Sequence, residues 1–363
     1  MKAFHRTLSL AASLAVLMFL VACNSNNKSG VVSPNASGNP NTITGAGSTF
    51  VYPVMSRWIA DYQKTNPSIQ INYQSIGSGG GIQQLKKGLV DFGASDAALS
   101  DEQLKEMPAI MQIPESAGPV CITYNLPELK QPLKLTSAAV AGIYMGTIKA
   151  WHDKEIAAAN PGVKLPDNPI VVAHRSDGSG TTNIFTNYLA AVNPNWKSKV
   201  GAGISVSWPV GLGGKGSEGV TGIVKQNPGG IGYVELTYAE ENRLPVAQVK
   251  NAAGEWVSPT ADAATAAINA FSEQLAKDAR IPIVNPPASA KDAYPISGLT
   301  YLLVPKEAKN AERGDNVKMF IQYVITQGQD QAVELHYAKL PLSLIELDKN
   351  TLGGQGSKMA GGN

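Results

Sequence analysis

Three short stretches of the sequence combine glycine with serine or threonine where a strand-like run gives way to a helix-like run. They are residues 45–50, 77–81 and 178–181. The first amide groups of a helix have no partner within the helix and carry partial positive charge, and glycine lets a ligand approach the backbone closely. Serine and threonine add hydroxyl donors, so three such turns that converge would hold a tetrahedral oxyanion. Three ordinary connecting turns are the alternative.

Arg175 supplies a fixed positive charge beside the third of these turns. A guanidinium group can donate two parallel hydrogen bonds to two oxygens of one ligand. Asp177, two residues later, would brace this group and offset its charge. A solvated surface pair is the other interpretation of Arg175 and Asp177, but the Gly-Ser-Gly-Thr run that follows favours ligand binding.

Asp96 ends a strand-like run in a stretch without basic residues. A carboxylate beside an anion repels it unless the anion has a proton to donate. Inorganic phosphate keeps at least one proton near neutral pH, whereas sulfate keeps none. Against sulfate, two acceptors would face each other without a hydrogen, at a penalty of order a few kcal/mol in a dry site. Asp96 is therefore our candidate specificity residue; a helix N-cap or an Asx-turn is the alternative.

Strand-like and helix-like segments alternate over most of the chain. Helical patterns are predicted at 50–63, 82–89 and 182–192, and Ser100 with Gln103 forms a capping box. The predicted strands are residues 41–44, 69–74, 170–174, 204–208, 231–236 and 299–304. This alternation predicts an α/β fold with mainly parallel sheets and flanking helices, in which ligands bind beyond the carboxyl ends of the strands.

The composition agrees with a globular protein of about two domains. The chain has 363 residues, of which 43% are hydrophobic and 16% charged. Its formal net charge of +2 provides no electrostatic case for a nucleic-acid partner.

The N-terminal segment has the pattern of an export signal. A basic start precedes an apolar run that is too short to span a bilayer, so we assign residues 1–22 to a signal peptide. The sequence Leu-Val-Ala-Cys at 20–23 resembles the lipobox of bacterial lipoproteins, in which Cys23 would carry lipid and give durable anchoring. Ordinary cleavage near Ala22 is the alternative.

The remaining segments complete the expected organisation. Residues 23–41 are rich in Asn, Ser, Gly and Pro, and we predict that they form a flexible tether. We predict that residues 349–363 form a frayed tail. With Cys23 lipidated, no intrachain disulfide is possible. Cys121, in a strand-like run, is expected to be a buried hydrophobic residue.

Five motifs, in order, resemble the phosphate-binding proteins of bacterial high-affinity phosphate ABC transporters. They are TGAGSTF (44–50), IGSGGGIQQ (76–84), DFGASD (91–96), RSDGSGT (175–181) and GLGGKG (211–216). The resemblance spans about residues 42–347 and implies a two-lobed type II periplasmic-binding fold. Its two crossovers would fall near 113–118 and 293–296. Lobe one would comprise 42–117 and 295–348, and lobe two 118–294.

The resemblance also implies a set of phosphate ligands. Thr49, Phe50 (through its backbone), Ser78 and Asp96 would come from lobe one, and Arg175, Ser179, Gly180 and Thr181 from lobe two. Asp177 would pair with the arginine, and Gly47 and Ser48 would lie behind the ligands. Two positions depart from the family pattern: Ser48 replaces a commoner alanine, and His174 stands where a second arginine is frequent.

The function that the resemblance implies is phosphate transport. A substrate-binding lipoprotein would capture hydrogen phosphate by lobe closure and deliver it to the transmembrane permease subunits of an ABC transporter. We expect a monomer in the cell envelope, periplasmic or extracytoplasmic, held to a membrane by its lipid anchor only. We expect no catalysis, no cofactor, no metal and no nucleic-acid partner.

Three other functions compete with this interpretation. Ser179 and His174 would suggest a nucleophile and its base, but they share one turn and no G-x-S-x-G elbow surrounds the serine. Residues 211–216 match G-x-G-x-x-G, a weak signal for a dinucleotide site. An envelope scaffold would use the same glycine-rich turns only as connections.

Overall fold

The computed structural model describes residues 38–107 and 109–353, which belong to one compact unit. The expected signal peptide, Cys23 and most of the tether lie outside the described residues, as does the tail from residue 354. Among the helices that the structure describes, none combines the length and the apolar character needed to cross a bilayer.

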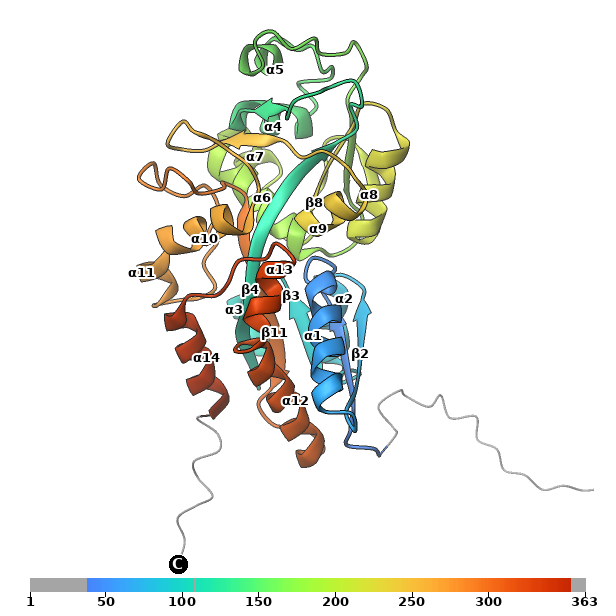
Figure 1. Ribbon diagram of the computed structural model, residues 1–363, viewed down its shortest axis with the longest axis vertical. Helices are drawn as coiled ribbons and strands as arrows, with labels where there is room; N and C mark the ends of the chain where they lie inside the picture. Colours follow the sequence, from blue (N-terminus) through green and yellow to red (C-terminus); the bar gives the residue numbers. More distant parts are fainter. Residues whose placement is uncertain (1–37, 108, 354–363) are drawn as a thin grey trace, which may run out of the picture. The chain divides into compact units, whose positions relative to one another are not determined.

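One eight-stranded sheet runs through both lobes (Figure 1), in the order β2-β1-β3-β11-β4-β8-β6-β7. The strands of lobe one are β1 (Thr42–Gly47), β2 (Gln70–Ser75), β3 (Phe92–Ser95), β11 (Ser297–Pro305) and the first part of β4 (Ile110–Tyr124). Those of lobe two are β6 (Val171–Arg175), β7 (Leu212–Gly214), β8 (Gly230–Glu235) and the end of β4. The two-lobed α/β class expected from the sequence is confirmed.

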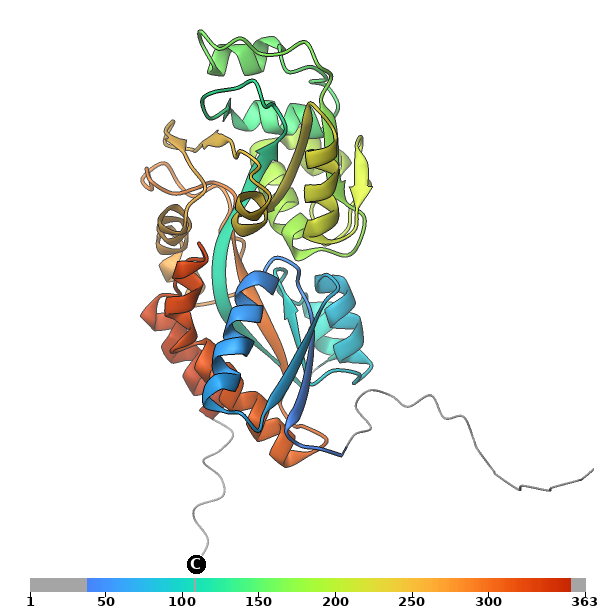
Figure 2. The ribbon, with the colours of Figure 1, turned by 45° about the vertical axis from the view of Figure 1, so that its right-hand side comes forward.

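Strand β4 carries the first crossover between the lobes. It pairs antiparallel with β11 up to Pro119 and antiparallel with β8 from Val120 onward. The chain returns just before β11, where the amide of Val120 donates to the carbonyl of Ile296 at 2.8 Å. Figures 1 and 2 show β4 and β11 lying side by side. Within the eight-stranded sheet, the parallel pairs of the described strands are β1 with β2 and β3, and β6 with β7 and β8.

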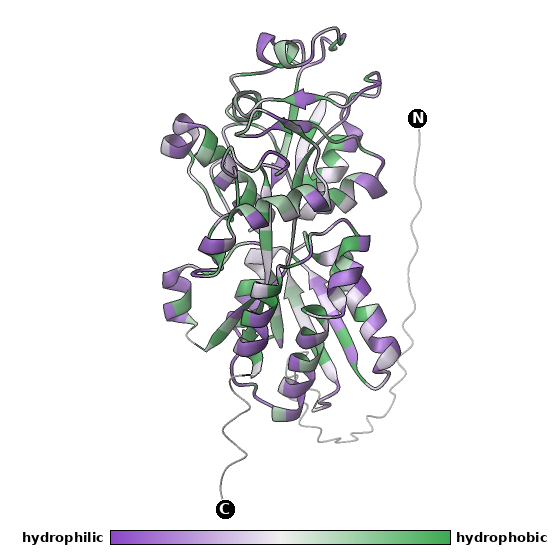
Figure 3. Cartoon of the chain, turned by 60° about the vertical axis from the view of Figure 1, so that its left-hand side comes forward, coloured by the Kyte–Doolittle hydropathy of each residue, from purple (hydrophilic) through white to green (hydrophobic). Residues whose placement is uncertain are grey.

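Four helices follow directly on the parallel strands. They are α1 (Tyr52–Thr65), α2 (Ser78–Lys86), α6 (Gly180–Val192) and α8 (Gly216–Gln226). Helix α2 begins four residues before its predicted start because the glycines at 79–81 are already helical, and α6 begins two residues early. Each helix turns an apolar face to the sheet; in α1, Val54, Met55, Trp58 and Tyr62 are buried. Figure 3 shows hydrophobic and hydrophilic residues alternating along the helices, as expected for helices with one buried face.

The other elements complete the two lobes. A three-stranded sheet in the order β10-β9-β5 packs in lobe two. The remaining bounds are α3 (Asp101–Glu106), β5 (Lys134–Leu135), α4 (Ser137–Tyr144), α5 (Lys154–Ala159), α7 (Pro194–Lys199), α9 (Leu236–Glu241), β9 (Gln248–Lys250), β10 (Trp256–Val257), α10 (Ala261–Ala270), α11 (Ser272–Leu275), α12 (Ala311–Val324), α13 (Gly328–Glu334) and α14 (Leu342–Gly353). The predicted capping box of α3 is present, and Cys121 is fully buried, as expected.

One predicted strand was wrong: residues 204–208 form no regular strand, and the short β7 occupies that edge of the sheet. The apolar residues there serve other contacts. The indole of Trp208 stacks on the imidazole of His174 with ring centroids 4.9 Å apart. The carbonyl of Ile204 accepts from the amide of Ser179 at 2.8 Å. The segment therefore supports the turn between β6 and α6.

Two segments differ from the expected organisation at their edges. Helix α14 continues to Gly353, past residue 349 where the tail was expected to begin, and it buries Asp348 and Leu352.

The stretch 261–283 lies at the junction of the lobes. Its residue Arg280 pairs with Asp101 of lobe one at 2.7 Å, and the Ala279 carbonyl accepts from the Tyr301 hydroxyl at 2.8 Å.

Candidate functional site

The three glycine- and hydroxyl-rich turns meet between the lobes. The amide of Gly79, at the start of α2, donates to the carbonyl of Gly178 at 2.9 Å. The amide of Gly180, at the start of α6, donates to the hydroxyl oxygen of Ser78 at 3.0 Å. Both bonds join lobe one to lobe two, and the turn between β1 and α1 joins them through Thr49. The helix N-termini therefore converge, as the sequence predicted.

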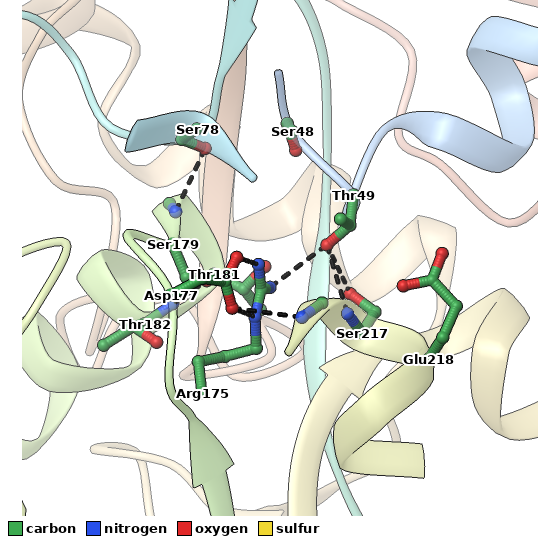
Figure 4. Close-up of polar contacts among 12 residues, drawn as sticks. Ser48, Thr49, Ser78, Arg175, Asp177, Ser179, Thr181, Thr182, Ser217 and Glu218 are labelled. Carbon is green, nitrogen blue, oxygen red and sulfur yellow. Dashed lines mark hydrogen bonds and ion pairs between the residues drawn. The ribbon is translucent and has the colours of Figure 1, made fainter. Parts of the chain in front are cut away.

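A fourth turn of the same chemistry joins the other three. Ser217 is the second residue of helix α8 and directly follows the GLGGKG run, and its hydroxyl lies 2.8 Å from the hydroxyl of Thr49 (Figure 4). The amide of Ser217 also donates to the Thr49 hydroxyl at 3.3 Å. Ser217 is a site residue that the sequence analysis missed. The signal was present, because glycine followed by a hydroxyl residue precedes this helix as it does the others.

Arg175 and Asp177 form a buried, two-pronged ion pair (Figure 4). The guanidinium Nε and Nη2 donate to the two carboxylate oxygens at 2.8 and 2.6 Å. The side chains are only 2% and 15% exposed, which contradicts a solvated surface pair. Burial acts to raise the pKa of Asp177, but its hydrogen bonds and charge interaction with Arg175 outweigh burial, and the pKa is lowered.

The free side of the arginine faces lobe one. Its Nη1 donates to the hydroxyl of Thr49 across the interface between the lobes at 3.1 Å. Its backbone amide donates to the hydroxyl of Tyr233 at 3.1 Å, which fixes the end of β6. The amide of Gly216 donates to Asp177 at 3.0 Å. The positive charge is thus held in place at the point where the turns meet.

Asp96 lies directly after β3 and is 3% exposed. Its Oδ1 accepts hydrogen bonds from the hydroxyls of Ser48 and Thr300, the latter at 3.1 Å. Its Oδ2 accepts from the hydroxyl of Thr181, on lobe two, at 3.4 Å. Ser100, not Asp96, caps the next helix, so the N-cap alternative is wrong. The residue stands instead at the junction of both lobes.

The environment of Asp96 decides its charge. Burial raises the pKa of its carboxyl to about 6, while the hydrogen bond from Ser48, the charge of Arg175 and the hydrogen bonds from Thr300 and Thr181 act in the opposite direction. At neutral pH the group is therefore an anion that accepts hydrogen bonds. Ser48, one of the two departures from the family pattern, adds a donor to this carboxylate.

The remaining candidate residues make contacts that mainly support the local structure. Phe50 is fully buried, and its carbonyl accepts from the hydroxyl of Tyr337 at 2.5 Å. The hydroxyl of Ser179 caps helix α6 by accepting from the amide of Thr182 at 3.1 Å. Gly47 has a φ of +148°, and a Cβ there would lie 2.0 Å from the Ala94 carbonyl oxygen. The side chains of Phe50 and Ser179 thus pack or cap behind the convergence point.

The catalytic alternative finds no support in these contacts. The Nδ1 of His174 lies 3.0 Å from the carbonyl oxygen of Arg175, and its ring stacks on Trp208. The hydroxyl of Ser179 is engaged in capping, so neither group activates the other. Within residues 38–107 and 109–353, there is no group of three or more His, Cys, Asp or Glu suited to hold a metal ion.

The arrangement combines neutral donors, one guanidinium whose charge is offset, and one carboxylate. Hydroxyl groups and helix N-termini favour an anion, whereas the carboxylate disfavours any anion that lacks a hydrogen. The chemistry that fits both features is the binding of a partly protonated oxyanion.

Comparisons with known proteins agree on the fold and on a family. A family model described as a PBP superfamily domain matches residues 34–327. The phosphate-binding protein PstS of Xylella fastidiosa (strain Temecula1 / ATCC 700964) is 45% identical over 305 residues, which cover 84% of this chain and 83% of that protein. The phosphate-binding protein PstS of Haemophilus influenzae is 40% identical, with coverage of 85% and 92%.

Solved structures show the same fold at lower identity. A high affinity periplasmic phosphate-binding protein (PfluDING) bound with phosphate matches with a TM-score of 0.69 at 23% identity, covering 85% of this chain and 93% of that one. A putative phosphate ABC transporter substrate-binding protein with bound phosphate from Clostridium perfringens matches with a TM-score of 0.59 at 20% identity, covering 83% and 100%.

The two lobes approach each other closely at Gly180, so this residue provides a test of the geometry. A Cβ at Gly180 would lie 2.6 Å from the Cβ, the amide nitrogen and Oδ2 of Asp96. We expect Gly180→Ala to separate the lobes and to increase the radius of gyration measured by small-angle X-ray scattering. Gly222→Ala in helix α8 is the control, because a Cβ there meets nothing within 4 Å. Identical scattering from wild type and Gly180→Ala would contradict the close approach.

Proposed function

The chain belongs to the PBP superfamily and, within it, to the phosphate-binding proteins named PstS, and on this premise we propose that it captures inorganic phosphate between its lobes and delivers it to an ABC permease. The observation that carries the proposal is the buried carboxylate of Asp96 at a point where neutral donors and Arg175 converge. Hydrogen phosphate satisfies all of these groups at once.

The proposed ligands come from both lobes. They are Thr49, the backbone of Phe50, Ser78 and Asp96 on one side, and Arg175, Ser179, Gly180 and Thr181 on the other. Support comes from the contacts across the interface between the lobes, in which Arg175 reaches Thr49 and Gly180 reaches Ser78. A ligand that contacts both sides stabilises the closed form by its differential affinity. The permease would then recognise the closed form.

The protein acts in this proposal as a carrier without catalysis or cofactor. The relatives named PstS are phosphate-binding proteins. We propose that the protein is a monomer, with both halves of the site provided by one chain. If an envelope scaffold were the function instead, equilibrium dialysis with labelled phosphate would show no retention at micromolar ligand.

We propose an extracytoplasmic location with a lipid anchor at Cys23. The residues concerned, 1–22 and Cys23, lie outside the described part of the chain, so the lipobox-like sequence alone supports this proposal. Cys23→Ser in the full chain should move the protein from the membrane fraction to the soluble fraction after export, because acyl chains provide the anchor. A detergent-phase partition of both proteins measures it. Equal partition would contradict lipidation.

Asp96 should control discrimination against sulfate in a pH-dependent way. Its raised pKa of about 6 means that the carboxyl gains a proton as the pH falls through that value and becomes a donor. Sulfate affinity should therefore rise as the pH falls through about 6. For an aspartate with an ordinary pKa, the rise would occur only at a lower pH. Asp96→Asn, with a donor at every pH, should bind sulfate already at neutral pH.

Titration calorimetry with phosphate and with sulfate provides the measurement. Asp96→Asn should weaken the preference for phosphate more than it weakens phosphate binding itself. Glu102→Gln, at an exposed position of α3, is the control for removal of one negative charge. Unchanged selectivity in Asp96→Asn would count against the role of proton acceptor.

Arg175→Ala should weaken phosphate binding by about 1.5–3 kcal/mol, roughly 10- to 150-fold, which is the range for hydrogen bonds to charged groups. The guanidinium is 2% exposed, so water screens the interaction little. Lys197→Ala removes one positive charge from an exposed position of α7 in the same lobe and should leave the affinity unchanged. Wild-type affinity in Arg175→Ala, measured by calorimetry, would remove this residue from the site.

A further inference from the structure

A second buried acid lies behind Asp96 and takes no part in the site described above. Glu115 is on strand β4 and is fully buried. Its Oε1 lies 3.1 Å from the hydroxyl of Thr300 on β11, and its Oε2 has no hydrogen-bond partner among the residues that the structure describes. The same Thr300 hydroxyl lies 3.1 Å from Oδ1 of Asp96. One hydroxyl group therefore stands between two carboxyl groups.

The number of hydrogens limits how this chain of three groups can be arranged. A threonine hydroxyl has one hydrogen to donate and can accept others. If both acids were ionised, Thr300 could satisfy only one of them, and its oxygen would face the other without a hydrogen between them. If Glu115 keeps its proton, it donates to Thr300, and Thr300 donates to Asp96. Every contact in the chain is then a hydrogen bond.

The surroundings decide which of the two acids is neutral. Asp96 has the Ser48 hydroxyl, the Thr181 hydroxyl and the charge of Arg175 to stabilise its anion. For Glu115, burial and the charge of Asp96 raise the pKa to about 8, against the hydrogen bond with Thr300 alone. Glu115 is therefore the protonated member at neutral pH.

The other elements packed around Glu115 leave this assignment in place. From β2, the phenol of Tyr73 lies near enough for the two groups to interact electrostatically, and burial raises its pKa, so it is neutral. From α13, the side-chain amide of Gln329 donates to the backbone carbonyl of Glu115 at 2.9 Å, not to its carboxyl. Asp96, after β3, is the charged group that acts on Glu115.

We propose that neutral Glu115 is a positioning residue for phosphate: it donates to Thr300, which fixes the Thr300 hydroxyl as a donor to Oδ1 of Asp96 and leaves Oδ2 to accept the hydrogen of the ligand. This inference rests on the proposed function. Loss of the Glu115 proton would draw the Thr300 hydroxyl away from Asp96 and place a second negative charge behind a site for a dianion. Phosphate affinity should therefore fall as Glu115 ionises.

The ratio of the phosphate dissociation constants of wild type and Glu115→Gln, measured from about pH 6.5 to about pH 9.5, tests the proposal. The glutamine amide is nearly isosteric and donates to Thr300 at every pH. Because both proteins meet the same mixture of phosphate species, ligand protonation cancels in the ratio. We expect a ratio within about twofold of unity at the lowest pH that rises above about pH 8, by at most about tenfold per pH unit.

Two further variants separate this role from general effects. Asp348→Asn removes another buried carboxyl group, on α14, and burial raises the pKa of that group to about 8 as well. The phosphate dissociation constant of this variant should depend on pH as it does in wild type. Thr300→Val removes the connecting hydroxyl. It should weaken phosphate binding at pH ~7 by about two- to tenfold, the effect of one neutral hydrogen bond. Above pH ~8, its phosphate dissociation constant should change less with pH than that of wild type. Thr300→Val alone decides the matter if Glu115→Gln does not fold by circular dichroism.

The outcomes are distinguishable. A ratio that rises with pH, with Asp348→Asn following wild type, supports the positioning role. Tight phosphate binding with a constant ratio, or a wild-type profile retained in Thr300→Val, overturns this inference and leaves the proposed function intact. Absence of phosphate binding by wild type at every pH overturns the proposed function and the inference together.

Discussion

The proposed phosphate site depends on keeping one buried carboxylate ionised and oriented between the two lobes. Asp96 is almost completely removed from water, and this burial favours the neutral form of its carboxyl group. Hydroxyl donors from Ser48 and Thr300 and the charge of Arg175 counter this effect. The same set of donors that would favour a bound anion therefore also holds the acid that, in our proposal, selects among anions. Neither group of residues would be useful without the other.

The fold brings these groups together through the pairing of β4 with β11. Asp96 follows β3, whereas Thr300 and Glu115 lie on β11 and β4, which pair with each other before β4 continues into lobe two. Helices α1, α2, α6 and α8 point their N-termini at the same region from both lobes. Glycine is required where the lobes touch, since a side chain at Gly180 would overlap Asp96.

Local patterns in the sequence were sufficient to predict the glycine- and hydroxyl-rich turns. They were insufficient to predict the hydrogen bonds that join Asp96 to Thr300 and Glu115. Glycine next to hydroxyl residues at a strand-to-helix junction is a pattern that can be recognised in the sequence alone. This pattern pointed to Thr49, Ser78 and the run from Arg175 to Thr181, and it is also present at Ser217. Thr300 and Glu115 meet Asp96 only because strands far apart in sequence pair in the sheet, and no local motif marks them. The predicted strand at 204–208 failed because its apolar residues pack around the β6–α6 turn instead of joining a ladder.

Titration calorimetry of the unmodified protein at neutral pH, first with phosphate and then with sulfate, measures the proposed selection of a protonated anion. We expect saturable binding of one phosphate per chain and no measurable heat from sulfate at the same concentrations, because only phosphate offers Asp96 a hydrogen. Comparable binding of the two anions, or binding of neither, would contradict it.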